Sequence, residues 1–369
     1  MIRLNFRKDK GLGSRIVMTG FRTRLVVLVG LLSAALLPSP ALAGDLESQF
    51  DRLLGTTPRA PRVAAPAAAI ETIRFRDLPA PIASARTGDA LEIQLAALAD
   101  NSQGRIGIAA LDLASGRSVA VLGDQPFPMA STSKIAIVAT FLAGVDQGRW
   151  SLSDQFPMMM PVPSKKFSTK VAPVREGALL SARQLIELTI TRSDNQATDA
   201  LLAVVGGPAA VTRWVHANTG ITEFRLDRDI ATLVRDDGAV DPALAVDKRD
   251  SITPNAMVRM LAGFHEGRWL SPSGNAVLLG AMSRCVTGRN RMKALLPTGT
   301  AIAHKTGTLF NTASDVGFIE APDGRKFAVA IYVTGQGGKQ GRESRIALLA
   351  RTIYDGYTAE APRRAALRR

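Results

Sequence analysis

Apolar and polar residues follow two different patterns, which separate the ends of the compact part of this chain from its middle. Short segments with the pattern of β-strands lie near both ends of this part. Between them, apolar residues recur every three or four positions, as in helices with one buried face. We expect strands at residues 106–111, 118–122, 301–305, 315–321 and 326–334, and helices at 90–99, 132–146, 182–192, 208–218, 254–264, 272–282 and 343–354.

Turn and capping residues support these elements. Ser181 and Gln184 form a capping-box pattern, and Pro254 and Pro272 stand where helices begin. The turn at 322–324, Pro-Asp-Gly, joins two expected strands. Strands at both ends with helices between them predict an α+β fold in three α/β/α layers. Its antiparallel sheet would be built from both termini, beside an all-helical lobe, with an active site in the cleft between them.

The first 43 residues have the pattern of a secretory signal peptide. An apolar run of 13 residues, Leu25 to Leu37, follows two arginines and precedes the small residues Ala41-Leu42-Ala43. A bilayer span needs about 20 apolar residues, so we expect no stable membrane anchor. We expect cleavage after Ala43 and a secreted, periplasmic protein. The stretch before the apolar run is long, and Met18 is a possible true start.

Composition divides the rest of the chain. Residues 44–87 are rich in proline and alanine and predict an arm or linker. Residues 88–357 form one expected catalytic domain without an internal repeat. Residues 358–369 carry four arginines and predict a frayed basic tail. We expect a monomer.

Charge, cysteine and histidine content exclude several classes of function. Of the net charge of +14, the first 43 residues contribute +6, and the remainder is scattered over a chain that is only 5% aromatic. We therefore expect no nucleic-acid partner. Cys285 is the single cysteine and is expected to be a small buried apolar residue. The histidines, His216, His265 and His304, have no metal-ligand spacing, so no metal site and no cofactor are predicted.

Three short motifs carry the candidate chemistry: Ser131-Thr132-Ser133-Lys134, Ser193-Asp194-Asn195 and Lys305-Thr306-Gly307. A serine hydroxyl needs a base to become a nucleophile, and a lysine three residues later lies one helical turn along the same face. Each motif alone is common, since Ser-Asp-Asn is an ordinary turn and Lys-Thr-Gly an ordinary strand end. In this order, each on the element that the chemistry needs, they predict an acyl-transfer site.

The expected roles follow from position. Ser131 would be the nucleophile at a helix N-terminus, and Lys134 its base, with a pKa lowered by burial and by the charge of Lys305. Ser193 would relay a proton to the leaving nitrogen. The backbone N–H groups of Ser131 and Thr308 would form the oxyanion hole.

The remaining motif residues would bind substrate. Asn195 is expected to hold a substrate amide, and Asp194 to brace its loop. Lys305, Thr306 and Thr308 offer donors to a substrate carboxylate, and Gly307 would allow the substrate backbone to lie close to the strand. A serine, histidine and acid triad through His304 is disfavoured, because neighbouring strand residues point to opposite faces.

With these motifs the chain resembles the class A β-lactamase family, from about residue 88 to residue 357. The resemblance includes 225–228 (Arg-Leu-Asp-Arg) and 249–250 (Arg-Asp), which look like the two ends of the family's Ω-loop, and 287–288 (Thr-Gly). It implies a serine hydrolase that opens β-lactam amides through an acyl-enzyme, which water then releases. The implied partner is a small β-lactam or a cell-wall peptide.

The chain departs from the family inside the Ω-loop. Ile230 stands where the family has the glutamate that activates the deacylating water, and Val234 stands where it has an asparagine. An apolar pair cannot orient or deprotonate water, so deacylation is expected to be slow. The loop is also longer than usual, and one of its acids could substitute, although loop acids are usually solvated charges. These acids are Asp229, Asp236, Asp237 and Asp241.

Two alternatives to a β-lactamase remain open. Penicillin-binding proteins share the three motifs, so the chain could be a D-Ala-D-Ala peptidase or transpeptidase. It could also be a sensor that binds penicillins or muropeptides without hydrolysing them, and the loss of both polar residues in the Ω-loop favours this reading.

Overall fold

The structure is a computed structural model that describes residues 72–74, 89–100 and 103–367. All of these lie in one compact unit, Pro61–Arg369. Its centre is a five-stranded antiparallel sheet with the strand order β10-β11-β12-β2-β3. The strands are β2 (Ile106–Asp112), β3 (Ser118–Val121), β10 (Ala301–Leu309), β11 (Thr312–Glu320) and β12 (Lys326–Thr334). The sheet thus joins segments from both ends of the described chain, and β10 is its edge strand.

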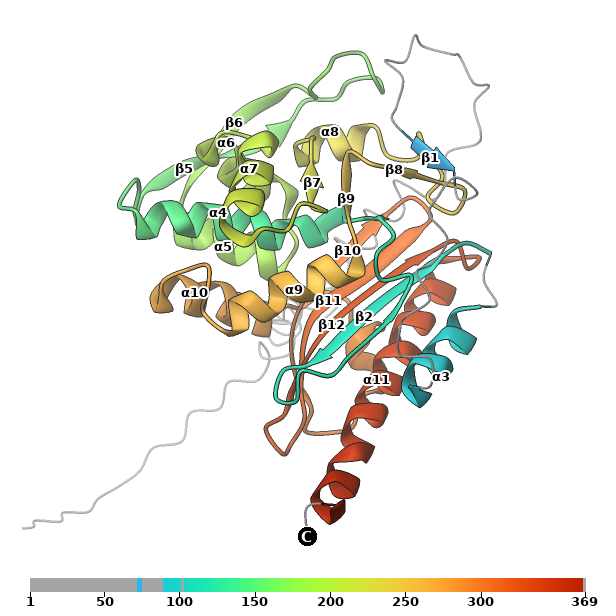
Figure 1. Cartoon of the computed structure of the whole chain (residues 1–369). Coiled ribbons are helices and arrows are strands. Elements are labelled where there is room, and N and C mark those ends of the chain that lie inside the picture. Colours follow the sequence, from blue (N-terminus) through green and yellow to red (C-terminus); the bar gives the residue numbers. More distant parts are fainter. Residues whose placement is uncertain (1–71, 75–88, 101–102, 368–369) are drawn as a thin grey trace, which may run out of the picture. The chain divides into compact units, whose positions relative to one another are not determined.

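Helices cover both faces of this sheet (Figure 1). On one face α3 (Ala90–Ala99) and α11 (Lys339–Leu367) lie side by side and share a core with alternate residues of β2 and β12. On the other face α9 (Pro254–His265) and the helical lobe form the larger core. The predicted α+β fold with three layers is therefore confirmed.

The helical lobe is built around α4 (Lys134–Asp146), which is buried along almost its whole length. A helix that is apolar on all sides becomes a core helix. The helices that pack against α4 include α5 (Ala182–Thr191), α6 (Asn195–Val205), α7 (Pro208–Thr219) and α10 (Pro272–Ser283). The helix α4 is therefore held in place from several sides.

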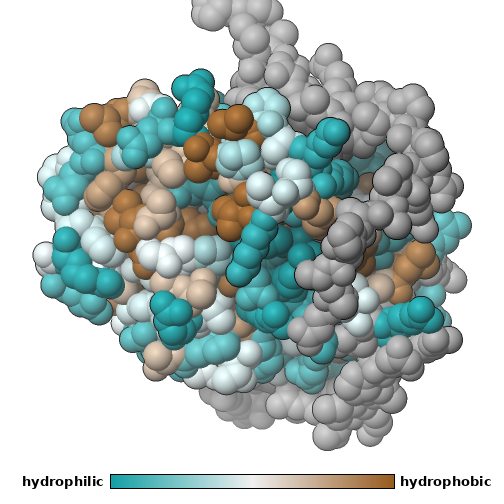
Figure 2. All heavy atoms as spheres, turned by 90° about the horizontal axis from the view of Figure 1, so that it is seen from above, coloured by the Kyte–Doolittle hydropathy of each residue, from teal (hydrophilic) through white to brown (hydrophobic). Residues whose placement is uncertain are grey.

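The sequence did not predict several elements of the fold. These are the hairpin of β5 (Gln155–Pro161) and β6 (Val174–Ser181), the small sheet of β4 (Phe127–Pro128), β9 (Asp250–Ile252) and β7 (Arg225–Leu226), the helices α6 and α8 (Ile230–Arg235), and the 3₁₀ turns η3 (Ala130–Ser133) and η4 (Met292–Leu295). Figure 2 shows apolar and polar patches mixed on the face that carries the β5–β6 hairpin. Exposed apolar residues of this hairpin and its connection include Phe167, Val171 and Leu179.

Two findings concern the predicted arm and tail. Within residues 44–87, the strand β1 (Thr72–Arg74) pairs antiparallel with β8 (Ala245–Asp247) of the Ω-loop. At the other end, α11 continues through Leu367, so residues 358–367 extend a helix where composition predicted a frayed tail. The predicted signal peptide, the start at Met18 and cleavage after Ala43 lie outside the described residues.

Over residues 72–74, 89–100 and 103–367, no single helix is both long and apolar enough to cross a membrane, although α6 and α7 pass that test together as a bent pair. In the same ranges, no group of three or more histidine, cysteine, aspartate or glutamate side chains is placed to hold a metal ion.

Candidate active site

The three predicted motifs lie on three different elements that meet at one end of α4. Ser131 belongs to η3 and Lys134 is the first residue of α4. Ser193 lies in the turn between α5 and α6, and Lys305 lies on the edge strand β10. Hydrogen bonds connect Lys134 and Lys305 to the same serine, Ser193, which is 59 residues from one and 112 from the other. The chain therefore brings the three motifs together.

The backbone around the nucleophile is unusual. Ala130, immediately before Ser131, has a φ of 48°, a left-handed conformation that is uncommon for a residue with a side chain. The segment is pressed against β10 at Gly307. A Cβ atom added there would lie 2.7 Å from the carbonyl oxygen of Met129 and 3.1 Å from Cβ of Ala130. Gly307 thus allows the strand to pack against the nucleophile's turn. Its predicted contact with the substrate backbone stays a prediction.

Lys134 is fully buried and its amine is held by three oxygen atoms. It donates to Oδ1 of Asn195 at 2.7 Å, to Oγ of Ser193 at 3.3 Å and to the carbonyl oxygen of Ser193. Burial holds the pKa of Lys134 well below its usual value, and the positive charge of Lys305 lowers it further. A lowered pKa favours the neutral form of the amine, which can accept a proton, as a base for Ser131 must.

Ser193 links the two lysines. Its hydroxyl accepts a hydrogen bond of 2.8 Å from Nζ of Lys305 and one of 3.3 Å from Nζ of Lys134. Its φ of 59° is again left-handed, and such strain persists where the surrounding structure holds a functional group in place. The arrangement gives a continuous path for a proton from Lys134 through Ser193.

The side chains of Asp194 and Asn195 make different contacts. The Asp194 side chain accepts from the backbone N–H of Ala197 at 2.8 Å and caps the N-terminus of α6, so it braces the loop as expected. The amide oxygen of Asn195 is occupied by Lys134. The amide nitrogen is the end of the Asn195 side chain that can donate to a substrate carbonyl.

A buried arginine that sequence reasoning missed supports the Lys-Thr-Gly strand. Arg291 is fully buried and donates to the carbonyl oxygen of Gly307 at 3.0 Å and to Oγ1 of Thr308 at 2.7 Å. The hydroxyl of Thr306 lies 2.6 Å from that of Thr287. Both threonine hydroxyls that were predicted to bind substrate are thus oriented by neighbouring side chains. No local motif marks Arg291, since it follows an irregular turn.

Cys285 differs from the prediction of a buried apolar residue. It is half-buried, and its thiol lies 3.2 Å from the hydroxyl of Thr287. Burial raises its pKa, but the hydrogen bond and charge of His304, the charge of Lys305 and the hydrogen bond of Thr287 together lower it to about 7. Nδ1 of His304 in turn lies 2.8 Å from the buried carboxylate of Asp315. Burial lowers the pKa of His304, but the Asp315 charge prevails and raises it to about 10.

A second buried acid, Asp199, also escaped sequence reasoning. It lies one helical turn after Asn195 on α6, a spacing that could have indicated it. Its two oxygens accept the backbone N–H groups of Ile230 at 2.7 Å and Ala231 at 2.8 Å. Burial raises the pKa of Asp199 to about 7 despite these bonds. Asp199 therefore anchors the first turn of the Ω-loop helix α8 to the wall of the site.

Comparison with known proteins identifies the family. The model of the beta-lactamase enzyme family matches residues 90–357. Beta-lactamase CTX-M-25 of Escherichia coli is 31% identical, over 72% of this chain and 88% of its own length. A solved variant of the class A beta-lactamase of the last common ancestor of Gram-negative bacteria is 34% identical. It covers 73% of this chain and 99% of its own, with a TM-score of 0.62. A beta-lactamase from Chitinophaga pinensis is 26% identical over 72% of this chain and 99% of its own, with a TM-score of 0.63.

The chain belongs to the beta-lactamase enzyme family. It is a serine hydrolase of the class A type, which confirms the family, the fold and the enzyme class predicted from the sequence.

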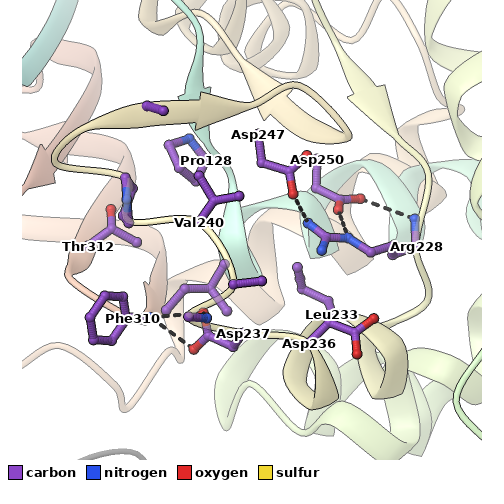
Figure 3. A pocket seen from close by; sticks show the side chains of 15 residues that line it. Pro128, Arg228, Leu233, Asp236, Asp237, Val240, Asp247, Asp250, Phe310 and Thr312 are labelled. Atoms are coloured by element: carbon purple, nitrogen blue, oxygen red, sulfur yellow. Dashed lines mark hydrogen bonds and ion pairs between the residues drawn. The ribbon is translucent and has the colours of Figure 1, made fainter. Parts of the chain in front are cut away.

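The acids in the Ω-loop of this β-lactamase brace the loop, and the expectation that they would be solvated charges is wrong. Asp229 caps α8 through the N–H of Thr232, and Asp236 accepts from the N–H of Phe167. Asp237 accepts from the N–H of Phe310, and Asp241 accepts from the Asn311 side chain. A cavity under the loop is bounded by Arg228, Leu233, Asp237 and Phe310 (Figure 3). No residue of the three motifs lines this cavity.

Proposed function

We propose that this β-lactamase opens β-lactam amides by forming an acyl-enzyme on Ser131, and that release of the acyl group is slow. The proposed acylation of Ser131 rests on one observation: two buried lysines, Lys134 and Lys305, both donate to Ser193 beside the turn that carries Ser131. A neutral Lys134 takes the Ser131 proton as the hydroxyl attacks the lactam carbonyl. The proton then passes through Ser193 to the nitrogen that leaves.

The backbone supplies the stabilisation of the tetrahedral intermediate. Ser131 lies in the first turn ahead of α4, where N–H groups carry partial positive charge. Thr308 lies on β10, the edge strand whose outer side faces η3. Their two N–H groups form the oxyanion hole in this proposal. The Thr306 and Thr308 hydroxyls and the Lys305 ammonium bind the substrate carboxylate, with Arg291 holding the strand.

The proposed slow release of the acyl group rests on Ile230 and Val234. Ile230 is 2% exposed and packs in the main core of the helical lobe, and Val234 packs against that core. Neither can polarise water. The loop carboxylates that could replace a base are engaged in bracing contacts, for example Asp237 with the N–H of Phe310. Slow deacylation follows, and the protein would act by capturing β-lactams more than by destroying them.

Three further proposals come from sequence. Secretory export rests on the apolar run that ends at Leu37 and the small residues before Gly44. A penicillin-binding or muropeptide-binding sensor is favoured by the same Ile230 and Val234 pair. A D-Ala-D-Ala peptidase rests on the shared motifs alone.

A labelling experiment tests the proposed function. The wild type and Ser131→Ala are incubated with a fluorescent penicillin and separated in a denaturing gel, with Ser283→Ala, an exposed serine on another helix, as the control. We expect a stable band in the wild type and the control and none in Ser131→Ala. Labelling of Ser131→Ala would refute the assignment of the nucleophile. Hydrolysis of a D-Ala-D-Ala peptide by the wild type would support the peptidase, which penicillin would also label.

A further inference from the structure

A segment outside the family's matched region completes the Ω-loop. The family match begins at residue 90, and the solved relatives cover 72% to 73% of this chain. The strand β1, at Thr72–Arg74, precedes that region, yet it pairs with β8 inside the loop. Figure 1 shows the two strands beside each other. The arm that precedes the matched region and the Ω-loop therefore meet.

The pairing is a regular antiparallel ladder. Thr72 faces Asp247, Ile73 faces Val246 and Arg74 faces Ala245. In the ranges that the structure describes, β1 is the ladder partner of β8 in a sheet of two strands. A two-stranded ribbon is marginally stable by itself, so its position depends on what else anchors it.

Ion pairs anchor β8 to the neck of the Ω-loop. Asp247, at the end of β8, lies 3.1 Å from a guanidinium nitrogen of Arg228 and 2.6 Å from one of Arg249. Arg228 also pairs with the buried carboxylate of Asp250. The β8 strand is thereby tied to both ends of the loop, and β1 lies along it.

The stretch before β8 reaches the substrate strand. Both oxygens of Asp237 accept the N–H of Phe310, at 2.9 and 3.1 Å, and Oδ1 of Asp241 accepts from the Asn311 side chain at 2.9 Å. Phe310 is two residues beyond Thr308, which belongs to the proposed oxyanion hole. On the opposite side, Lys166 donates to the carbonyl oxygen of Asp237. The loop thus closes the space between the β5–β6 connection and the end of β10.

We propose that residues 72–74 are a strap that holds the Ω-loop closed beside the end of β10 and so determines which acyl side chains reach Ser131. This inference rests on the proposed function. Only 14 residues separate Arg74 from Asp89, so the strap stays at a high effective concentration near β8. When the strap leaves, β8 loses its ladder, residues 236–247 move more freely and large acyl side chains enter more easily. Small ones enter equally well in both states.

The test breaks the ladder in the full-length chain. Ile73→Pro removes a backbone N–H and fixes φ at about −65°, away from the more extended φ of an antiparallel strand. Ile73→Val keeps the backbone N–H and leaves φ free, so it is the matched control. Ala68→Pro controls for a new proline elsewhere in the arm. We measure hydrogen exchange of residues 236–247 and the acylation rate constants for one β-lactam with a large acyl side chain and one with a small one.

We expect only Ile73→Pro to raise hydrogen exchange in residues 236–247, by about tenfold. In the same variant, the acylation rate constant for the large β-lactam divided by that for the small one should rise about tenfold. Unchanged exchange would overturn the strap. Faster exchange with an unchanged or lower ratio would overturn its control of access. If no variant, including the wild type, is acylated, the proposed function fails and access control fails with it, while exchange still decides whether the strap exists.

Discussion

Asp199 makes the stability of this protein depend on pH in a direction opposite to most surface carboxylates. Its carboxylate is buried in α6 and holds the N–H groups of Ile230 and Ala231. Burial raises its pKa from 3.8 to about 7. The unfolded chain therefore releases this proton near pH 4, while the folded chain keeps it until about pH 7. Between these values the folded state binds more protons, so raising the pH destabilises it.

The size of the effect follows from the two pKa values. The interval from 3.8 to about 7 corresponds to about 4 kcal/mol at 1.36 kcal/mol per pH unit. Asp199→Asn removes the titration and keeps one oxygen that can accept from one of the two N–H groups. The lost hydrogen bond lowers stability by about 1–3 kcal/mol at every pH. The free energy of unfolding of the wild type minus that of the variant should therefore fall by about 4 kcal/mol between pH 4 and pH 8.

Denaturant unfolding of both proteins across this range measures the difference directly. Asp247→Asn is the matched control, because Asp247 is also a loop-bracing carboxylate but has a lowered pKa. Burial raises that pKa, and the bonds and charges of Arg249 and Arg228 more than offset the effect. Its stability contribution is lost only as the pH falls below about 4, so this variant should show a constant offset from pH 5 to pH 8. A constant offset for Asp199→Asn as well would refute the reasoning.

Three other changes have defined outcomes. Lys305→Ala should slow acylation about 100-fold and move the acidic limb of its pH profile to higher pH, because the charge that helps to lower the Lys134 pKa is gone; an unmoved limb would contradict this coupling. Ile230→Glu with Val234→Asn should speed loss of the acyl adduct at least about tenfold, followed by mass spectrometry, if the missing water base limits turnover. The thiol of Cys285 should react with iodoacetamide with a midpoint near pH 7, and His304→Ala should move that midpoint upward; equal midpoints would exclude an effect of His304.

The site could be predicted from the sequence where chemistry imposes a local pattern. A lysine one turn after a serine, a polar turn and a lysine on an edge strand are recognisable separately, and their order implies that Lys134, Ser193 and Lys305 meet. The helices α5, α9 and α10 were recognisable because capping residues or proline mark their starts, whereas α6, which follows Ser193, was not predicted. The C-terminal part of α11 was not predicted, because residues 358–367, which composition assigned to a basic tail, continue the helix to Leu367.

The features that could not be predicted depend on contacts between segments that are distant in the sequence. Arg291 is a single residue in an irregular stretch, and only the fold places it behind Gly307 and Thr308. The pairing of β1 with β8 joins residues more than 170 positions apart without any side-chain motif. The loop acids were misread because composition cannot distinguish a solvated carboxylate from one that accepts a backbone N–H, as Asp237 does from Phe310.

The most direct test of the central claim is time-resolved intact mass of the chain from Gly44 to Arg369 mixed with excess penicillin, with the free drug followed in the same tube and the adduct mapped by peptide mass. The account predicts one drug per protein, on Ser131, that persists while most of the drug survives. An adduct on another residue, or no adduct with the drug intact, would contradict the proposed nucleophile. Catalytic disappearance of the drug would contradict slow release and show that a group other than Ile230 and Val234 activates water.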